Sequence, residues 1–159
     1  CGRLVGEWVD LAYWETADEL QHRIGELLDK WDVEEYAIHD HENVPSSLVS
    51  EYGTDFDTLM EWVRLWMEDE RTACAVAKWM DYTGVTSIRE AREKYYGDYT
   101  PPTRTMDAKV NFAHHYAEDT GMLSDTSEVV ARHFDYESFA RDLFLTDFTE
   151  LDGHIFLDH

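Results

Sequence analysis

The sequence is poor in basic residues, cysteines and prolines, and it lacks long apolar runs. Only 13 of its 159 residues are Lys or Arg. Direct binding to nucleic acid or to anionic membranes is therefore disfavoured, because an excess of acids repels phosphates. No stretch approaches the roughly 18 apolar residues that a membrane span requires, and no secretory signal is visible.

Cys1 and Cys74 are the only cysteines. Without a CxxC spacing they fit a reducing cytoplasm better than a disulfide-bonded protein, although one disulfide is possible. No Cys/His zinc spacing, P-loop or Gly-x-Ser-x-Gly motif occurs. These absences favour a protein with no enzymatic activity, no cofactor and no metal. The chain begins with Cys rather than Met, so we expect that it lacks its native start.

Acidic residues dominate what is present. The 35 Asp and Glu residues give a net charge of −22, and most of the excess lies in residues 1–53 and 107–159. Along the ~39 Å diameter of a compact chain of this length, 22 charges lie about 1.8 Å apart. Duplex DNA has a similar density of about one charge per 1.7 Å. A cationic surface is therefore the natural partner.

Hydrophobic residues still make up 43% of the chain, enough to form cores. Thr16 and Glu19 have capping-box spacing ahead of an apolar face that runs from Leu20 to Trp31. Further helices are predicted over 55–69, over 73–80 with an end before Gly84, and over 87–96, 107–120, 126–133 and 136–143. Strands are predicted over 4–11, 36–38, 144–148 and 154–157, the last two around a turn at Asp152-Gly153. The best linker candidate is 99–105.

This order of elements predicts the α+β class, with α+β regions at both ends and a helical middle. The N-terminal α+β region covers 1–53, the central helical region covers 54–98, and the C-terminal α+β region covers 99–159. We find no internal repeat and no low-complexity run that would change this division.

The acids of the predicted helices point away from the apolar faces. At about 100° per residue, the acids of the helix 16–31 fall on the side opposite its apolar residues. Like charges at i,i+4 cost a helix a few tenths of a kcal/mol each, so their frequency suggests a use. Solvated helix faces are often charged, and only the whole set, with bases so scarce, is informative. The candidate partner-binding residues are Asp18, Glu19, Glu26, Asp29, Asp32, Glu34, Glu35, Asp57, Glu61, Glu68, Asp107, Glu118, Asp119, Asp125 and Glu128.

Several motifs resemble the ArdA antirestriction family. The most specific is Phe134 to Leu143 (FDYESFARDL), followed by Gly153-His154-Ile155-Phe156. Three further blocks match in the right order: Gly2 to Trp8 (GRLVGEW), Glu34 to Asp40 (EEYAIHD), and Tyr116 to Leu123 with its core at Glu118 to Gly121 (EDTG). The residues assigned to the main motif, with structural roles, are Phe134, Asp135, Tyr136, Phe139, Arg141, Asp142 and Leu143.

The resemblance implies three small subdomains, over 1–53, 54–98 and 99–159, in a curved, elongated rod. It also implies a homodimer joined mainly through the C-terminal subdomains. Such a dimer imitates bent B-form DNA and blocks bacterial type I restriction-modification enzymes. The family normally has a strand before the Gly-x-Leu block, and here only Cys1 precedes Gly2. We therefore expect the family's first strand to be absent here, either because the chain was trimmed or because that strand is replaced. The match over 54–106 rests only on helical character.

Three other interpretations remain. The chain could be an acidic module that binds another basic DNA-binding protein, or a salt-adapted acidic protein, as its four Lys residues permit. An unrecognised enzyme is the third. Within His39 to Glu42 (HDHE), two histidines on one side of a strand could bind a metal, but the matched block has no metal role. For Arg141-Asp142 we expect a structural ion pair or a subdomain contact.

Overall fold

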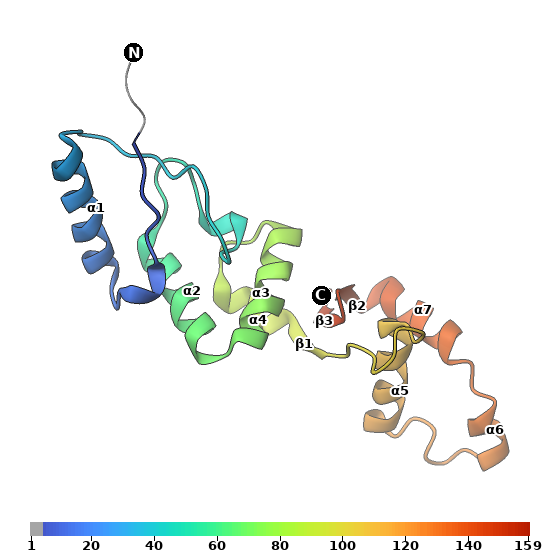
Figure 1. Ribbon diagram of the computed structural model, residues 1–159. Coiled ribbons are helices and arrows are strands. Elements are labelled where there is room, and N and C mark those ends of the chain that lie inside the picture. The colour runs from blue at the N-terminus through green and yellow to red at the C-terminus, as the bar shows by residue number, and fades with distance from the viewer. Residues whose placement is uncertain (1–4) are drawn as a thin grey trace. The chain divides into compact units, whose positions relative to one another are not determined.

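A computed structural model describes residues 5–159 (Figure 1). By its internal contacts the chain divides into two compact units, Cys1–Arg92 and Glu93–His159. The described residues form α-helices and one small antiparallel sheet, which confirms the α+β class. The three subdomains over 1–53, 54–98 and 99–159 stay a prediction.

The first unit is built from helices. α1 (Ala17–Trp31) begins where the capping spacing predicts: the Thr16 hydroxyl accepts the N–H of Glu19 at 3.3 Å. The Glu19 carboxylate in turn accepts the N–H of Glu15 at 2.9 Å, one residue before the expected Thr16. The two bonds satisfy backbone donors that the first turn leaves unpaired. Two short 3-10 helices, η1 (Leu11–Tyr13) and η2 (Ser46–Leu48), lie on either side of α1 in the chain.

The next helices are α2 (Phe56–Glu68) and α3 (Glu70–Thr83). The boundary between the two units falls within α4 (Ile88–Lys94). Asp69 separates α2 from α3. Its N–H bonds the Leu65 carbonyl at 2.9 Å, and its carboxylate accepts the N–H of Thr72 at 3.1 Å. One residue therefore ends one helix and caps the next, which produces the tight helical hairpin visible in Figure 1. α3 ends at Gly84, as predicted, with φ at +76°.

The two strands predicted in the first unit are wrong. Residues 5–10 and 36–38 have no regular structure, and Leu4 lies outside the described residues. A strand needs a neighbour to accept its backbone hydrogen bonds. Residues 36–38 have one such bond, from the Ile38 N–H to the Glu51 carbonyl at 3.1 Å. Residues 5–53 therefore contain no strand. Their Val and Trp residues favour a strand, but no neighbouring segment of the described chain pairs with them as one.

The second unit holds the sheet, formed by β1 (Tyr95–Asp98), β2 (Phe148–Leu151) and β3 (His154–Leu157) in the order β1-β3-β2. Leu151 and His154 close the β2–β3 hairpin. Asp152 and Gly153 between them have φ of +51° and +87°, as an Asp-Gly hairpin turn requires. The predicted turn and the strand 154–157 are confirmed.

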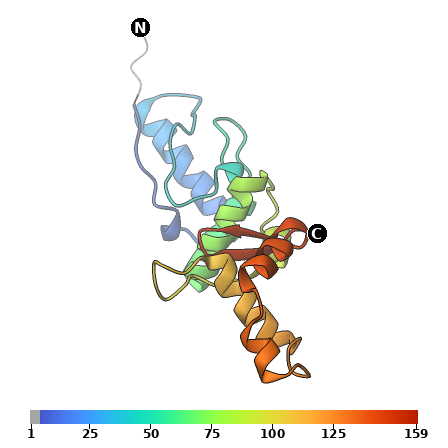
Figure 2. The same cartoon turned by 90° about the vertical axis from the view of Figure 1, so that its right-hand side faces the viewer.

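Helices α5 (Ala108–Thr120), α6 (Glu128–Arg132) and α7 (Tyr136–Thr146) complete this unit. Fully buried Phe112 and Ile155 pack with Leu143 and Phe148, so α5, α7 and the β2–β3 hairpin share one core. Figure 2 shows the ribbons of these elements from a second side. Phe112 lies within 5.7 Å, centroid to centroid, of five other aromatic rings. Ring packing therefore dominates this core.

Three boundaries differ from the predictions. Residues 144–146 extend α7 instead of starting a strand, because Phe144 continues the helix face that buries Ala140 and Leu143. Residues 95–96 leave the predicted helix 87–96 to form β1, whose Tyr95 pairs with Phe156. The segment 99–105 is irregular, but the Tyr99 N–H bonds the Gly153 carbonyl at 2.8 Å and its ring packs on the core. Tyr99 is therefore not part of a free linker.

Candidate partner-binding surface

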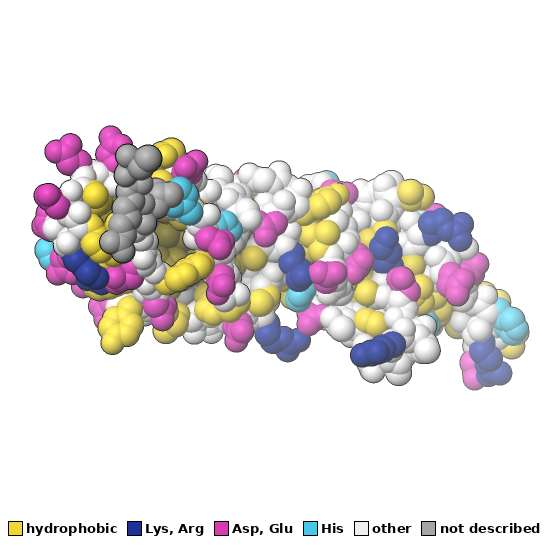
Figure 3. Space-filling view, turned by 45° about the horizontal axis from the view of Figure 1, so that its top comes forward, with side chains coloured by type: hydrophobic (Ala, Val, Ile, Leu, Met, Phe, Trp, Pro, Cys, Tyr) yellow, Lys and Arg dark blue, Asp and Glu magenta, His cyan; other side chains and the backbone are white. Residues whose placement is uncertain are grey.

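The acidic side chains of residues 5–159 are almost all at the surface. Every Asp and Glu in this range is exposed except Glu150, which is half-buried. The reason is the large cost of burying a carboxylate without a partner. Figure 3 shows the result on one face, where Asp and Glu side chains recur over the surface and Lys and Arg are fewer. All 15 acids predicted as partner-binding residues are exposed.

Both units are acidic. The sequence of the first has 21 acidic and 8 basic residues, and that of the second has 14 and 5. The charge is therefore not confined to one unit. A cationic partner could be attracted to either.

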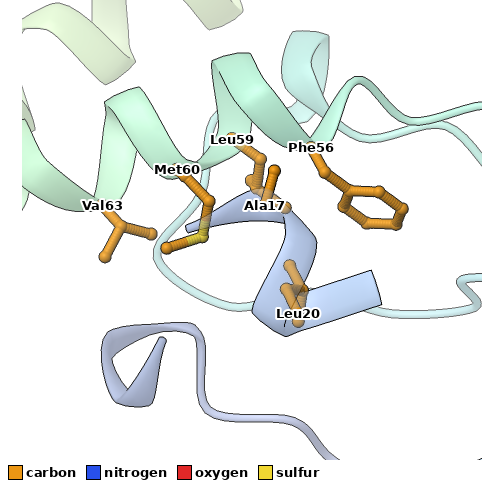
Figure 4. Close-up of a cluster of buried hydrophobic side chains, with 6 residues drawn as sticks. All are labelled: Ala17, Leu20, Phe56, Leu59, Met60 and Val63. Carbon is orange, nitrogen blue, oxygen red and sulfur yellow. The ribbon is translucent and has the colours of Figure 1, made fainter. Parts of the chain in front are cut away.

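The acids of α1 are presented by the packing of its opposite face. Leu20 is 2% exposed, and Figure 4 shows it with Ala17 against the side of α2 that carries Phe56, Leu59, Met60 and Val63. Burial of this face holds the helix by its apolar side. Asp18 and Asp29 consequently project into solvent.

Glu7 binds both basic residues of α1. Glu7 accepts hydrogen bonds from Arg23 at 2.6 Å and from Lys30 at 3.0 Å. Lys30 chiefly, and then Arg23, hold the pKa of Glu7 below its ordinary value. Arg23 also pairs with Glu26 at 3.1 Å, and this contact with the one to Glu7 raises its pKa. Within residues 5–53 these are the only Lys and Arg residues, so little positive charge is left to neutralise the other acids there.

Four of the predicted acids have a local role. Glu19 belongs to the cap of α1, and Asp107 caps α5 by accepting the Lys109 N–H at 2.8 Å. Glu26 pairs with Arg23, and Glu128 pairs with Arg132 at 2.7 Å. The others form no salt bridge with any residue of 5–159: Asp18, Asp29, Asp32, Glu34, Glu35, Asp57, Glu61, Glu68, Glu118, Asp119 and Asp125. These eleven, here called the unpaired acids, are available to a partner.

One acidic neighbour was missed from the sequence. Glu51 lies beside Tyr52, and its charge and hydrogen bond, with a smaller contribution from Glu35, raise the pKa of the Tyr52 hydroxyl. The bond from Ile38 to Glu51 brings the two segments together. Glu51 thereby adds to the charge of 34–35. No periodic pattern could reveal it, because both segments are irregular.

The FDYESFARDL motif has a structural role at its start. The Asp135 carboxylate accepts the N–H and hydroxyl of Ser138 at 3.0 and 2.7 Å, which caps α7 and lowers the Asp135 pKa. Phe134 packs against the rings of Tyr136 and Phe139, and Leu143 is buried. These contacts hold the start of α7 and part of the second core. The structural roles assigned to the motif as a whole stay a prediction.

Arg141 and Asp142 of the same motif are both exposed. Neither forms a salt bridge with a residue of 5–159, so the expected ion pair is wrong. Consecutive helix residues point in different directions and do not face each other. Whether they make a subdomain contact stays a prediction.

The His39–Glu42 segment is irregular, so the premise that its two histidines share a strand face is wrong. Among residues 5–159 no group of three potential His, Cys, Asp or Glu ligands lies close enough to hold a metal ion. In the same range no helix is long and apolar enough to cross a membrane.

A comparison with protein families matches residues 1–156 to the family described as Antirestriction protein (ArdA). The match includes Gly2, Arg3 and Leu4 of the first motif, which lie outside the described residues. A search of curated proteins returned no significant match.

Proposed function

The chain belongs to the ArdA antirestriction family, and on that premise we propose that it inhibits type I restriction-modification enzymes by occupying their DNA-binding groove. The observation that carries the proposal is the set of unpaired acids on both units. Enzymes hold DNA largely through Lys and Arg on phosphates. Carboxylates on a folded surface offer the same cations an alternative anion.

The proposed mechanism requires no bond to be made or broken, so the chain acts as an inhibitor rather than as an enzyme. Phosphate contacts position a protein on DNA without reading its sequence. A mimic of the phosphates alone can therefore inhibit enzymes that recognise different target sequences. A preshaped surface also avoids the energy of bending DNA, which amounts to about 1–6 kcal/mol for a 20–30 base-pair site.

The pairing of the cations of α1 supports this mechanism. Arg23 and Lys30 would repel a cationic groove if their charges were unpaired, but Glu7 binds both. The eleven unpaired acids have no such internal cation among residues 5–159. An enzyme's Arg and Lys side chains can reach them without displacing an existing pair.

We propose further that the active form is an elongated homodimer with three subdomains per chain, working in the bacterial cytoplasm. The dimer carries twice the charge of one chain, which has a net charge of −22. It binds neither nucleic acid nor membranes, for the electrostatic reason given above. Light scattering coupled to size-exclusion chromatography tests the dimer, and small-angle X-ray scattering tests the elongation.

The central experiment titrates a purified type I methyltransferase bound to fluorescent DNA with this protein. We expect the anisotropy to fall to the value of free DNA at near-stoichiometric protein. The midpoint should rise in proportion to the DNA concentration. A midpoint independent of DNA would show inhibition at another site and would overturn the proposal.

A second set of titrations distinguishes a distributed surface from a local site. Single Asp→Asn changes at Asp18, Asp57 and Asp119 should each weaken displacement by no more than about fivefold, the effect of one exposed ion pair. Loss of all displacement from one such change, in a variant that stays folded, would show a localised site instead. Urea unfolding of each variant supplies the folding control.

The alternative of an acidic module for another basic DNA-binding protein uses the same surface. A chain that leaves the methyltransferase on DNA but displaces a bacterial nucleoid protein would favour this alternative. The salt-adapted interpretation predicts unfolding at low ionic strength, where self-repulsion is least screened. Retained structure at about 10 mM salt would exclude it.

A further inference from the structure

A hollow of about 460 Å³ opens within the second unit, where the loop after β1 passes α5. Asp98, Tyr99 and Thr100 line it from the strand end and the loop, and Asn111 and His115 line it from α5. The loop is part of the segment 99–105, for which the sequence indicated only a linker. None of the unpaired acids lines the hollow, so the hollow is separate from the acidic surface that those residues form.

The wall of the hollow is held by hydrogen bonds. The Asn111 side-chain amide donates to the Tyr99 carbonyl at 2.9 Å, and the Tyr99 N–H donates to the Gly153 carbonyl at 2.8 Å. The Asp98 carboxylate accepts the N–H and hydroxyl of Thr100 at 2.9 and 2.7 Å. Gly153 itself has a φ of +87° and lies so close to Thr100 that a Cβ would collide with it. A site fixed in this way needs little ordering when a ligand binds.

The residues that line the hollow supply hydrogen-bond acceptors, one carboxylate and aromatic rings. Because the Asn111 nitrogen is bound to Tyr99, its carbonyl oxygen remains as an acceptor on the other side of the amide. Asp98 contributes a carboxylate. The Tyr99 and His115 rings lie 5.6 Å apart at an interplanar angle of 54° and provide two aromatic walls.

This combination selects the sign and the shape of a ligand. Asp98 and Asp119 would repel an anion. Asp119 is close enough to act on Tyr99, because burial chiefly, and then Tyr96 and Asp119, raise the pKa of Tyr99. A guanidinium fits better than an ammonium. Its planar group can stack on an aromatic ring while its N–H groups donate in a fixed fork to a carboxylate and an amide oxygen.

We propose that this hollow receives a single arginine side chain of the restriction enzyme, as a specific anchor within an otherwise distributed charge contact. The inference rests on the proposed function for the identity of the partner, and on Asp98, Tyr99, Asn111 and His115 for the choice of arginine. The volume exceeds that of a guanidinium group, so part of the arginine stem enters with it. A few anchored side chains commonly dominate the energy of an interface.

The first test uses the full chain and a short peptide as the probe. Acetyl-Gly-Arg-Gly-amide is titrated at pH 7.5 against the isotope-labelled protein, with acetyl-Gly-Lys-Gly-amide as the matched cation. We expect saturable NMR shifts at the Asn111 side-chain amide and at the His115 ring, with weaker binding of the lysine peptide. The absence of saturable shifts, or equal binding of the two peptides, would overturn the inference.

Two variants and one control assign the binding to the hollow. Asp98→Asn keeps an oxygen to accept from Thr100 but removes the charge, and His115→Ala removes an exposed aromatic wall. Each should weaken arginine-peptide binding about two- to fivefold, as expected for an exposed ionic or cation–π contact. Asp147→Asn makes the same change of charge in the same unit, outside the hollow, and should have no effect. Equal effects of Asp98→Asn and Asp147→Asn would contradict the proposed site.

The displacement assay then separates the two proposals. Asp98→Asn should raise the displacement midpoint about two- to fivefold over that of Asp147→Asn. If the wild-type chain displaces DNA but no peptide binds in the hollow, the arginine site is wrong and the proposed function stands. If the arginine peptide binds in the hollow but the chain displaces no DNA, the proposed function is wrong.

Discussion

Neutralising four acids on α1 and the segment after it should weaken competition with DNA far more than neutralising four scattered acids. The test variant combines Asp18→Asn, Asp29→Asn, Glu34→Gln and Glu35→Gln. All four side chains are exposed and form no salt bridge with a residue of 5–159. Asp18 and Asp29 lie about 16 Å apart along one helix face, comparable to several phosphate spacings of a DNA strand.

The expected magnitude follows from the exposure of these side chains. An exposed ion pair contributes roughly 0.2–1 kcal/mol, so four pairs with the enzyme contribute about 0.8–4 kcal/mol. This corresponds to a displacement midpoint about fourfold to several hundredfold higher than that of the wild type. Stability should change little, because the substitutions also relieve repulsion among like charges.

The control variant combines Glu70→Gln, Glu137→Gln, Asp147→Asn and Asp158→Asn. It has the same net charge as the test variant, but its four positions are spread over both units and were not predicted to bind the partner. Anisotropy titration at about 150 mM salt compares the two, with urea unfolding to show that both are folded. If the midpoints shift equally, net charge alone drives binding, and the reasoning from a particular acidic surface is refuted.

Three further predictions concern the fold that presents this surface. Gly153→Ala should destabilise the chain more than Gly53→Ala in urea unfolding: the two glycines have φ of +87° and +86°, but only at Gly153 does a Cβ meet Thr100. Equal losses would show that backbone strain alone matters. Phe112→Ala should cost about 3–5 kcal/mol, because this ring is fully buried at the centre of the second core; a loss below about 1 kcal/mol in the same assay would contradict that role. Hydrogen bonds from Thr58, Thr72 and Ser138 lower the pKa of Asp55, Asp69 and Asp135. The stabilisation from these caps is therefore complete above the ordinary carboxyl pKa of about 4 and is lost as the pH falls through the lower folded values. Between about pH 4 and 2 the urea midpoint of the wild type should fall by more than that of the triple Asp→Asn variant, and equal slopes would argue against the caps.

The helices could be predicted because their determinants are local. Thr16 with Glu19 marks the start of α1, and Gly84 and Gly121 mark the ends of α3 and α5. Each signal is read within four residues of the backbone group that it satisfies. The apolar spacing within each helix then indicates which side is buried and which side carries the acids.

The strands were less predictable because pairing is not local. Tyr95 of β1 pairs with Phe156, so the partner that makes it a strand lies at the far end of the sequence. Residues 5–10 have the composition of a strand but gain no such partner among the described residues. Strand propensity therefore expresses fit to a neighbour more than a preference of the chain.

Some features of the acidic surface likewise have local causes, and others depend on contacts between distant residues. The excess of acids and their place on the polar sides of helices follow from composition and short-range periodicity. The motifs are also read from the residues alone, but they indicate the family through resemblance to known members. Only the tertiary structure decides that Glu7 binds Arg23 and Lys30, which lie 16 and 23 residues away, and that Asn111 and Gly153 fix the loop around the hollow. Such contacts depend on where the packing of apolar faces brings distant segments, and no pattern along the chain records that outcome.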